Sequence, residues 1–574
     1  MLGLEYFFLA PIVAVGLAAA LHSHGYLSRE PFSSRVRFHC FFWSTLAAMA
    51  GVVFAPGKLS FLIAWEAMGL ASAGLVAFDT EEKAVRKATW IYLLACHAGA
   101  CALMLAGVML GDSSFVWAAF ACAVIGFGLK VGFPPFHVWL PEAHPAAPAP
   151  ASAVMSGAMI PLGIYGLSRF IFTMEFQRTV SRAGVYPVGL TILALGLVGA
   201  LGGILFALPQ TNLKKLLAFS SVENMGVVAI GFGFGLFGME VDSVLGIAAV
   251  SGALAHVLNH ATLKGALFLG AGSVLRGAGT LDQDRLGGLM KRMPITGALF
   301  TFNSLGLAGL PPLNGFLGEL LIYFAAFRAV QSGAPVVMAA GFAILVVLSL
   351  TGGLAAVAYT KAIGAVFLGE PRSRGAAEAR ETQWTMWGAQ AFLSALSIAM
   401  IPGTYGVVFF LSYICGVTDE VWNPIAGVLD VATLAGAVVI LIAGLLIAVR
   451  RYLCPRGAVK PAVPTWDCGY REPTARMAYT ATAFTQPIAD FFRDLLRPRR
   501  HVIAFKGHPA SPTDAAIATE TDDIALAGFW RPVFTKTARL FQLGHLLQNG
   551  SLHFYILLIL IAVVVMIAAA LMTR

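Results

Sequence analysis

Hydrophobic residues fill long stretches of this chain, and short polar segments interrupt them at intervals. Runs such as Ala118–Leu129, Val431–Val449 and Tyr555–Met572 are nearly free of charge, and about 20 apolar residues suffice to cross a bilayer. If Gly and Pro are allowed inside helices, the pattern predicts about 14 membrane crossings. They are centred near residues 12, 46, 68, 99, 124, 162, 196, 225, 259, 312, 352, 399, 441 and 563. We therefore expect an all-α polytopic membrane protein.

The positions of the basic residues predict how the chain is oriented. Odd-numbered connections carry most of the Lys and Arg residues, and Arg178 and Arg182 are the exception. By the positive-inside rule, both termini then lie on the outer side of the cytoplasmic membrane. The first apolar run, Leu4–Leu21, has no basic region before it and is interpreted as a retained helix, with a signal peptide as the alternative.

Hydropathy and polar segments also divide the chain into regions. Residues 450–550 are polar and contain no spanning run, which predicts a cytoplasmic excursion. Within it, Phe529–Leu547 alternates apolar and basic residues at helical spacing, as in a helix that lies along a membrane surface, and a mobile loop is the alternative. The predicted regions are N-terminal helices (1–57), a first bundle (58–208), a second bundle (209–370), additional helices (371–449), the excursion (450–550) and a final membrane helix (551–574).

Composition narrows the function classes. Of 574 residues, 58% are hydrophobic and 12% are charged, against roughly a quarter charged in a soluble domain. The net charge of +9 is spread over short connections, so topology explains it better than nucleic-acid binding does. The seven Cys residues form no C-x-x-C pair, and no Walker motif, nucleophile elbow or redox-cofactor motif is present. We expect no cofactor, no metal and no redox chemistry in this chain.

An internal echo indicates a duplicated architecture. "GFPPFHVWLPE" begins at Gly132 and "GLPPLNGFLGE" begins at Gly309, and each has Pro-Pro two positions after its Gly and a Glu ten positions after it. Proline-broken helices at corresponding places of two halves are typical of transporters built from repeated bundles.

A few ionisable residues lie within apolar segments, where they cost several kcal/mol unless they have a partner or a function. The first half contributes Glu66 and Lys130, which either form a structural ion pair, belong to a proton path, or do both. His97 is either a satisfied interhelical histidine or a relay member, and Lys361 either belongs to the path or extends its ammonium to the interface. Glu142 and His144 are expected at the solvated cytoplasmic rim. The second half contributes His256, His260, Lys264 and Glu319.

The spacing of His256, His260 and Lys264 is the most specific of these signals. Positions i, i+4 and i+8 share one helical face. Two His residues could bind a metal, but Lys is no fitting ligand, and no carboxylate or Cys accompanies them. A buried row of titratable groups one turn apart favours proton transfer, and a moving carboxylate could switch a lysine between its charged and neutral forms.

These motifs resemble the antiporter-like proton-pumping subunits shared by respiratory complex I, Mrp-type sodium/proton antiporters and group 4 [NiFe] hydrogenases. Five stretches match. They begin at Trp65 ("WEAMGL"), Gly128, Leu213, His256 and Ala308 ("AGLPPLNGFLGELLIY"). Later stretches, such as "PTWDCGYREPTARMAYTATAFTQPI", are most similar to the subunit of formate hydrogenlyase and hydrogenase-4.

The resemblance implies two inverted five-helix repeats, each with a broken helix, and a hydrophilic axis at mid-membrane. It implies that Glu66 is the carboxylate that partners Lys130, that Lys264 is the second switching lysine, and that Glu319 is the terminal acid or base. His256 and His260 would form the relay.

Two positions depart from the family pattern. Ser156 and Pro161 stand where relatives usually have the Lys or His of a central relay, so water or His97 would have to bridge Lys130 and the His256 stripe.

The resulting hypothesis is a proton-conducting, non-redox subunit driven by electron transfer in partner membrane subunits and a peripheral redox arm. The alternatives are a sodium-transporting Mrp-type subunit and a membrane anchor with an impaired proton path.

Overall fold

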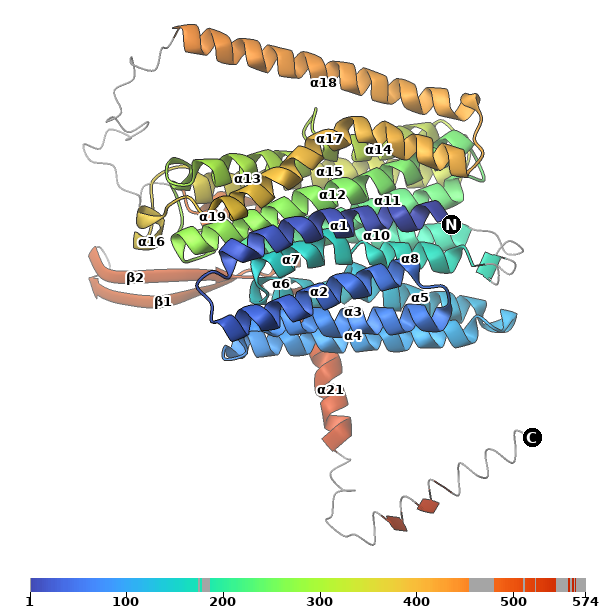
Figure 1. The fold of residues 1–574 in the computed structure, drawn as a ribbon, viewed down its shortest axis with the longest axis horizontal. Helices are drawn as coiled ribbons and strands as arrows, with labels where there is room; N and C mark the ends of the chain where they lie inside the picture. Colours follow the sequence, from blue (N-terminus) through green and yellow to red (C-terminus); the bar gives the residue numbers. More distant parts are fainter. Residues whose placement is uncertain are drawn as a thin grey trace. The chain divides into compact units, whose positions relative to one another are not determined.

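The computed structural model describes residues 2–173, 176–177, 186–453, 479–508, 511–521, 523–542, 556–557, 560–561 and 563. Contacts divide the chain into two units, Met1–Thr521 and Asp522–Arg574. The first unit is built from long helices (Figure 1), which confirms the predicted all-α membrane fold. A two-stranded antiparallel hairpin within the predicted excursion, β1 (Arg499–His508) with β2 (Ser511–Glu520), is an addition that hydropathy did not predict.

The helices coincide with most of the segments that the hydropathy pattern predicted. In the described part of the chain, twelve helices are long and apolar enough to cross a membrane. The crossing expected near residue 312 is divided between two shorter helices, and the one expected near residue 563 lies largely outside the described residues, so the total of 14 stays a prediction.

The first-half helices are α1 (Leu2–Tyr26), α2 (Phe32–Phe54), α3 (Lys58–Val76), α4 (Lys83–Met109), α5 (Val116–Val131), α6 (Leu140–Ala146), α7 (Ala149–Val154), α8 (Leu162–Ile171) and α10 (Tyr186–Ala207). They are followed by α11 (Leu213–Gly238), α12 (Ser243–Ala278), α13 (Pro294–Leu307), α14 (Asn314–Val330), α15 (Pro335–Phe367), α16 (Arg374–Glu378), α17 (Trp384–Ile414) and α18 (Asp419–Leu453).

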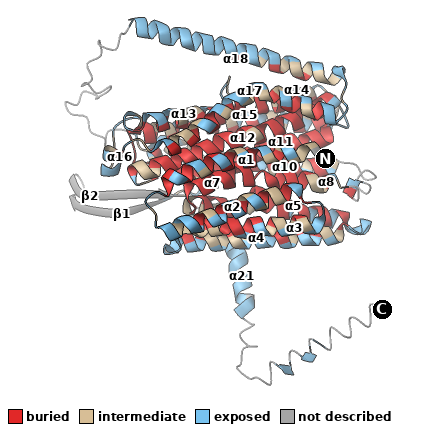
Figure 2. Ribbon diagram, viewed as in Figure 1, coloured by how far each residue is buried: buried red, intermediate tan, exposed pale blue. Residues whose placement is uncertain are grey.

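The centre of the bundle is formed by α7, α11 and α12, which are buried along nearly their whole length (Figure 2). Helices α2, α3 and α4 bury only one face each. A helix that is buried on all sides meets protein rather than lipid, so polar side chains on it can be satisfied by neighbouring helices. Five buried ionisable residues lie on these helices: Lys214 and Glu223 on α11, and His256, His260 and Lys264 on α12.

Glycines allow α10 and α11 to pack backbone against backbone. A Cβ at Gly226 would lie 2.2 Å from the backbone nitrogen of Ala200, and one at Gly203 would lie 2.4 Å from that of Glu223. Real Cβ atoms do not approach this closely, so only Gly fits. The small residues therefore set the position of the α11 backbone.

Both Gly-x-Pro-Pro motifs interrupt a helix, as the echo predicted. Helix α5 ends at Gly132, which has a φ of +84°, and the turn Phe136–Trp139 leads into α6. In the second half, Gly309 has a φ of +66° and separates α13 from α14. Both Pro-Pro peptide bonds are cis. The inverted relation of the two halves stays a prediction.

A third interruption was not predicted. The π-helical segment Met155–Met159 lies between α7 and α8 and is followed by Pro161. Such π segments are rare and often occur at functional sites. Ser156, one of the two departures from the family pattern, lies on this segment.

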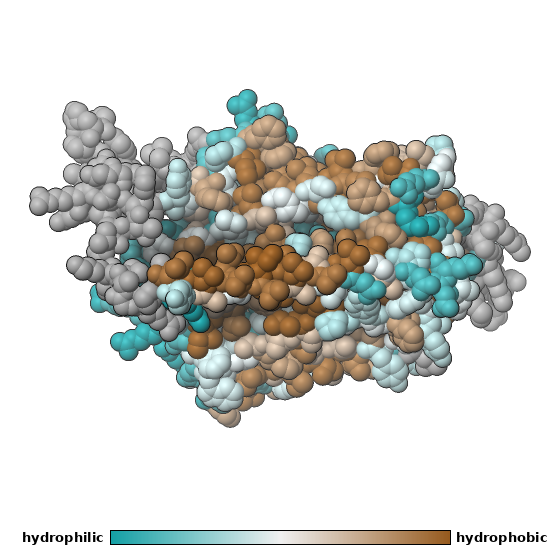
Figure 3. All heavy atoms as spheres, turned by 90° about the horizontal axis from the view of Figure 1, so that it is seen from above, coloured by the Kyte–Doolittle hydropathy of each residue, from teal (hydrophilic) through white to brown (hydrophobic). Residues whose placement is uncertain are grey.

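Helix α18 lies at the edge of the first unit. Only Ile425, Leu429 and Gly436 of its 35 residues are buried, and its apolar side chains form a continuous row in Figure 3, seen from the side of α18. Helix α18 approaches the bundle closely at Gly436, where an added Cβ would lie 2.4 Å from Cβ of Pro312.

One described part of the predicted excursion is docked on the bundle. Helices α19 (Ala481–Phe491) and α20 (Arg493–Leu496) follow a segment outside the described residues. The Thr482 hydroxyl donates to Asp284 Oδ2 at 2.5 Å, and its backbone N–H donates to Oδ1 at 3.0 Å.

In the second unit, the π-helical segment Ala525–Trp530 leads into α21 (Arg531–Gln542). This confirms that part of Phe529–Leu547 is helical. Its location on a membrane surface stays a prediction.

Candidate functional site

Lys264 is buried inside the second bundle and is held by three oxygen atoms. Its Nζ donates to the carbonyl oxygen of Leu217 at 3.1 Å, to the Ser220 hydroxyl, and to the Tyr359 hydroxyl at 3.2 Å. These groups belong to α11 and α15. All three partners are neutral, so hydrogen bonds satisfy the ammonium without neutralising its charge.

The nearby carboxylate is Glu223, a residue that the sequence reasoning missed. It is buried on α11, accepts a hydrogen bond from Asn224 Nδ2, and interacts electrostatically with Lys264 and with Glu319. The signal was available: Glu223 lies in "LLAFSSVENMGVVAIGF", where an ionisable residue stands among apolar ones. That is the criterion which selected Glu66.

The predicted His stripe meets the same helix. His256 is buried, and its Nε2 lies 3.1 Å from Asn224 Oδ1. His260 is buried too, and neither ring nitrogen has a hydrogen-bond partner among the described residues. Since His256 and Lys264 both reach groups on α11, the structure brings the stripe and Glu223 together.

The second break connects to this cluster through two amides. Asn259 Nδ2 donates to the carbonyl oxygen of Asn314, at the start of α14, at 2.8 Å, and Asn314 Nδ2 donates to Asn259 Oδ1 at 3.0 Å. Glu319 lies further along α14 and is half-buried. Its carboxylate packs against the second break, since a Cβ at Gly309 would lie 3.0 Å from Glu319 Oε2.

Lys130 lies in a different environment from the one that the resemblance implied. It is buried near the end of α5, with Nζ 3.5 Å from Cys96 Sγ and 5.7 and 5.5 Å from the ring centroids of Trp65 and Tyr92. In the described residues, no carboxylate oxygen lies within 4.0 Å of this Nζ. Aromatic faces and a thiol therefore surround the ammonium.

Glu66 pairs with His97 instead. Glu66 Oε2 lies 3.1 Å from His97 Nδ1, and the two side chains are 32% and 51% exposed. The neighbouring residues Trp65 and Cys96 contact Lys130. Adjacent residues on a helix point about 100° apart. On α3, Trp65 therefore faces Lys130 while Glu66 points to a more exposed position, and on α4 the same holds for Cys96 and His97.

Polar groups occupy the region between the two halves. The hydroxyls of Ser156 and Ser221 lie 2.8 Å apart, and Ser221 follows Ser220, which binds Lys264. Lys214, near the start of α11, is buried, and its Nζ donates to the carbonyl oxygen of Ala147 at 2.6 Å. Hydroxyl groups thus join the two halves at Ser156 and Ser221.

The expectation for His144 is wrong. Its ring is completely buried, with its centroid 4.9 Å from that of Phe268, because α6 packs into the bundle after the first break. Glu142, on the same short helix, is partly exposed, with Oε2 3.7 Å from Lys87 Nζ and Oε1 3.7 Å from Lys215 Nζ. Its location at the rim stays a prediction.

The Lys361 side chain is buried inside the protein and does not extend to the surface of the bundle. Its Nζ donates to the carbonyl oxygens of Leu208 at 2.5 Å and Gln210 at 2.7 Å. Both carbonyl groups belong to the turn that follows α10, where buried backbone oxygens need a donor from outside the helix. Lys361 therefore fastens α15 to the turn between α10 and α11.

The comparisons with known proteins agree with this architecture. The family described as "NADH:quinone oxidoreductase/Mrp antiporter, TM" matches residues 55–349, a range that contains every candidate named above from Glu66 to Glu319. Hydrogenase-4 component B of Escherichia coli (strain K12) is 30% identical over 99% of this chain and 88% of its own length. Formate hydrogenlyase subunit 3 of the same strain is 33% identical over 66% of this chain and 60% of its own length.

A solved structure has the same fold. It is that of an archaeal respiratory membrane complex, the membrane-bound sulfane sulfur reductase, in which one chain has a TM-score of 0.73 at 21% identity, covering 98% of this chain and 88% of that one. The chain therefore belongs to the NADH:quinone oxidoreductase/Mrp antiporter family, as an antiporter-like membrane subunit similar to hydrogenase-4 component B.

Proposed function

We propose that this chain translocates protons within a membrane assembly of the hydrogenase-4 or complex I-like type, whose partner subunits carry out electron transfer. The observation that supports it most is the buried cluster of Lys264, Glu223, His256 and His260 on two fully enclosed helices. Charges so deep in a membrane are costly unless they carry a function. The partners would be other membrane subunits and a peripheral redox arm, in the cytoplasmic membrane, with both termini of this chain outside.

The geometry suggests how Lys264 acts as a switch. Burial penalises the ammonium form, whereas a nearby carboxylate favours it. If Glu223 turns towards Lys264, the lysine is stabilised with its proton; if Glu223 turns towards Asn224, the lysine can release it. His256 and His260 would then receive the proton and pass it to Glu319.

Lys130 would be the corresponding base of the first half. In this structure its cation is stabilised by the rings of Trp65 and Tyr92, and such contacts contribute about 2 kcal/mol when desolvated. A change that brings Glu66 from His97 to Lys130 would raise the affinity of Lys130 for its proton. The Ser156–Ser221 hydroxyl pair, together with water, would connect the two halves.

Glu223→Gln should reduce proton movement strongly, because it keeps the size of the side chain but removes the charge that modulates Lys264. The expected loss is about 100-fold or more, the usual contribution of a positioned acid or base. Proton uptake into vesicles containing the assembled complex measures it. Glu240→Gln, on the turn that follows α11, is the matched control and should leave the rate unchanged. If proton uptake by Glu223→Gln equals that of wild type, Glu223 is not part of the path.

Sodium is the discriminating ion in the same vesicles. Proton movement should be the same with and without sodium. A rate that requires sodium would replace this proposal with the Mrp-type alternative.

Gly309→Ala should disturb the Glu319 carboxylate as well as the backbone. A left-handed conformation costs a non-Gly residue about 1–2 kcal/mol, and the added Cβ would press on Glu319 Oε2. Gly333→Ala is the matched control, because its φ is +73° and nothing lies within 4 Å of its Cβ. Both variants should lose similar thermal stability, whereas only Gly309→Ala should slow proton movement. Equal proton rates would mean that Glu319 does not need its present position.

A further inference from the structure

A surface cavity of about 450 Å³ lies between the end of α1 and the first half of α2. Sites for small molecules have volumes of about 300–1,000 Å³. Helix α2 contributes most of the lining, and none of the residues assigned to the proton path belongs to it. We call it the α1–α2 cavity.

One face of α2 changes from basic to apolar along its length. Arg35, His39 and Trp43 follow one another at i, i+4 and i+8, so they share a helical face, and all three line the cavity. Trp43 is 52% exposed, and it lies about 12 Å from Arg35 along the helix axis. A phospholipid has the same order of groups, with a charged head at one end and apolar chains below it.

His24 adds a third base from the facing helix. It lies in the last turn of α1, lines the cavity and interacts electrostatically with His39. No acidic residue lines the cavity, and Glu30, in the connection between the two helices, is paired with Arg276 Nη2 at 3.0 Å. In the described part of the chain, none of the three bases lies within 4.0 Å of a carboxylate oxygen. The charge of the cavity is therefore complementary to an anionic group.

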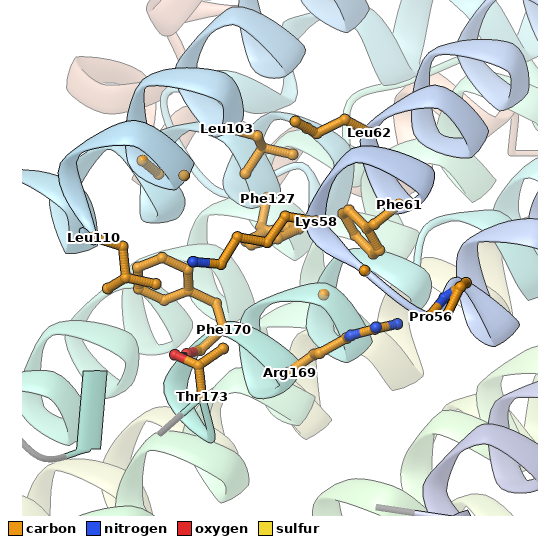
Figure 4. A pocket seen from close by; sticks show the side chains of 14 residues that line it. Pro56, Lys58, Phe61, Leu62, Leu103, Leu110, Phe127, Arg169, Phe170 and Thr173 are labelled. Atoms are coloured by element: carbon orange, nitrogen blue, oxygen red, sulfur yellow. The ribbon is translucent and has the colours of Figure 1, made fainter. Parts of the chain in front are cut away.

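The cavity in Figure 4 lacks this arrangement. It has a volume of about 330 Å³ and lies between α3, α4, α5 and α8. The charged ends of Lys58 and Arg169 lie on opposite sides of it, so one anionic group cannot contact both. In the α1–α2 cavity, by contrast, His39 lies one helical turn from Arg35 and interacts with His24.

We infer that the α1–α2 cavity binds an anionic phospholipid of the cytoplasmic leaflet, with its phosphate held by Arg35, His39 and His24 and an acyl chain along Trp43. In the predicted orientation the connection between α1 and α2 faces the cytoplasm. Basic pockets between membrane helices on that side bind anionic lipid headgroups. The positive-inside rule accounts for an arginine in this connection, but it does not account for two histidines that face one cavity.

A lipid at this position would join α2 to the rest of the bundle. Helix α1 is fixed to α12, because His22 Nε2 lies 3.0 Å from the carbonyl oxygen of Leu269, whereas α2 buries only one face. A ligand that binds the folded state stabilises it. Phosphatidylglycerol should therefore raise the thermal stability of the assembled complex.

Binding can be measured on the full chain in its assembled complex, delipidated and titrated with phosphatidylglycerol or phosphatidylcholine, with bound lipid counted by native mass spectrometry. Wild type should bind phosphatidylglycerol in preference to phosphatidylcholine. Arg35→Gln should weaken phosphatidylglycerol binding about fivefold, because one cation near the membrane surface is removed, and His24→Gln/Arg35→Gln/His39→Gln should weaken it further. Arg37→Gln is the matched control, since Arg37 lies on the same helix, donates to the carbonyl oxygen of Phe78 and lies over its ring, but does not line the cavity.

A second pair of variants tests the cavity without changing its charge. Cys40 is exposed and lines the cavity, whereas Cys101 is exposed on α4 and does not line it. Cys40→Phe should lower phosphatidylglycerol binding because the larger side chain occupies the cavity, and Cys101→Phe should not. Equal binding of the two lipids, equal loss in Arg37→Gln, unchanged binding in the Arg35 and Cys40 variants, or displacement of the lipid by inorganic phosphate would each overturn the inference.

Discussion

Lys264→Arg is expected to leave the subunit folded and assembled but to abolish proton movement. Arginine keeps the positive charge that Glu223 and the surrounding oxygens accommodate, so the cluster stays electrically balanced. It cannot release its proton under physiological conditions, because its guanidinium stays protonated. If Lys264 acts by switching between charged and neutral forms, the substitution blocks it in one state. Proton uptake and subunit content, measured on the same vesicles, separate function from assembly.

Lys264→Ala tests whether Lys264 also stabilises the fold. Lys264→Ala leaves buried oxygens on α11 and α15 without their donor, and each buried group left unsatisfied costs about 1–3 kcal/mol, so this variant should lose both proton movement and thermal stability. Lys215→Ala is the control, since Lys215 precedes Leu216 on α11 but has a partly exposed side chain that faces Glu142. Proton uptake by Lys264→Arg at the wild-type rate would refute the switching role.

Gly226→Ala should destabilise the whole bundle. The added Cβ would lie 2.2 Å from the backbone nitrogen of Ala200, and a backbone cannot move aside as a flexible side chain can. Overpacking costs about 1–3 kcal/mol, and occasionally more, and we expect this variant at the upper end because α11 is buried on all sides. The thermal stability of the purified subunit in detergent measures the effect.

Gly202→Ala is the matched control on α10. A Cβ at Gly202 meets no atom within 4 Å, and Ala is favoured over Gly in a helix by about 1 kcal/mol. This variant should therefore be as stable as wild type or more so. If the two variants have the same stability, the close contact between α10 and α11 does not exist in the membrane.

Hydropathy predicted the helices of this chain well because a bilayer requires long apolar segments. The same pattern located both helix breaks, since Gly and two successive Pro residues cannot continue a regular helix. It could not predict the hairpin at Arg499–Glu520, which lies in a polar region where no membrane constrains the backbone. Nor could it show that α18 contacts the bundle so sparsely, because exposure to lipid and burial in protein both favour apolar residues.

The candidate site was only partly predictable. An ionisable residue in an apolar run is visible in the sequence, and that criterion selected Glu66, Lys130 and Lys264. Which of them meet depends on how each helix is rotated about its axis, and for this reason the pairing of Glu66 with His97 was not predicted. Glu223 was missed because its stretch was interpreted only as part of the family resemblance.

The proton-to-electron stoichiometry of the assembled complex tests the central claim most directly. It should be measured in sealed vesicles for wild type, Lys130→Ala and Lys264→Ala, with substrate turnover recorded at the same time. The proposed function predicts that turnover persists while fewer protons cross the membrane per electron in each variant that assembles. An unchanged ratio in both variants would contradict it and would favour a subunit that only anchors the complex.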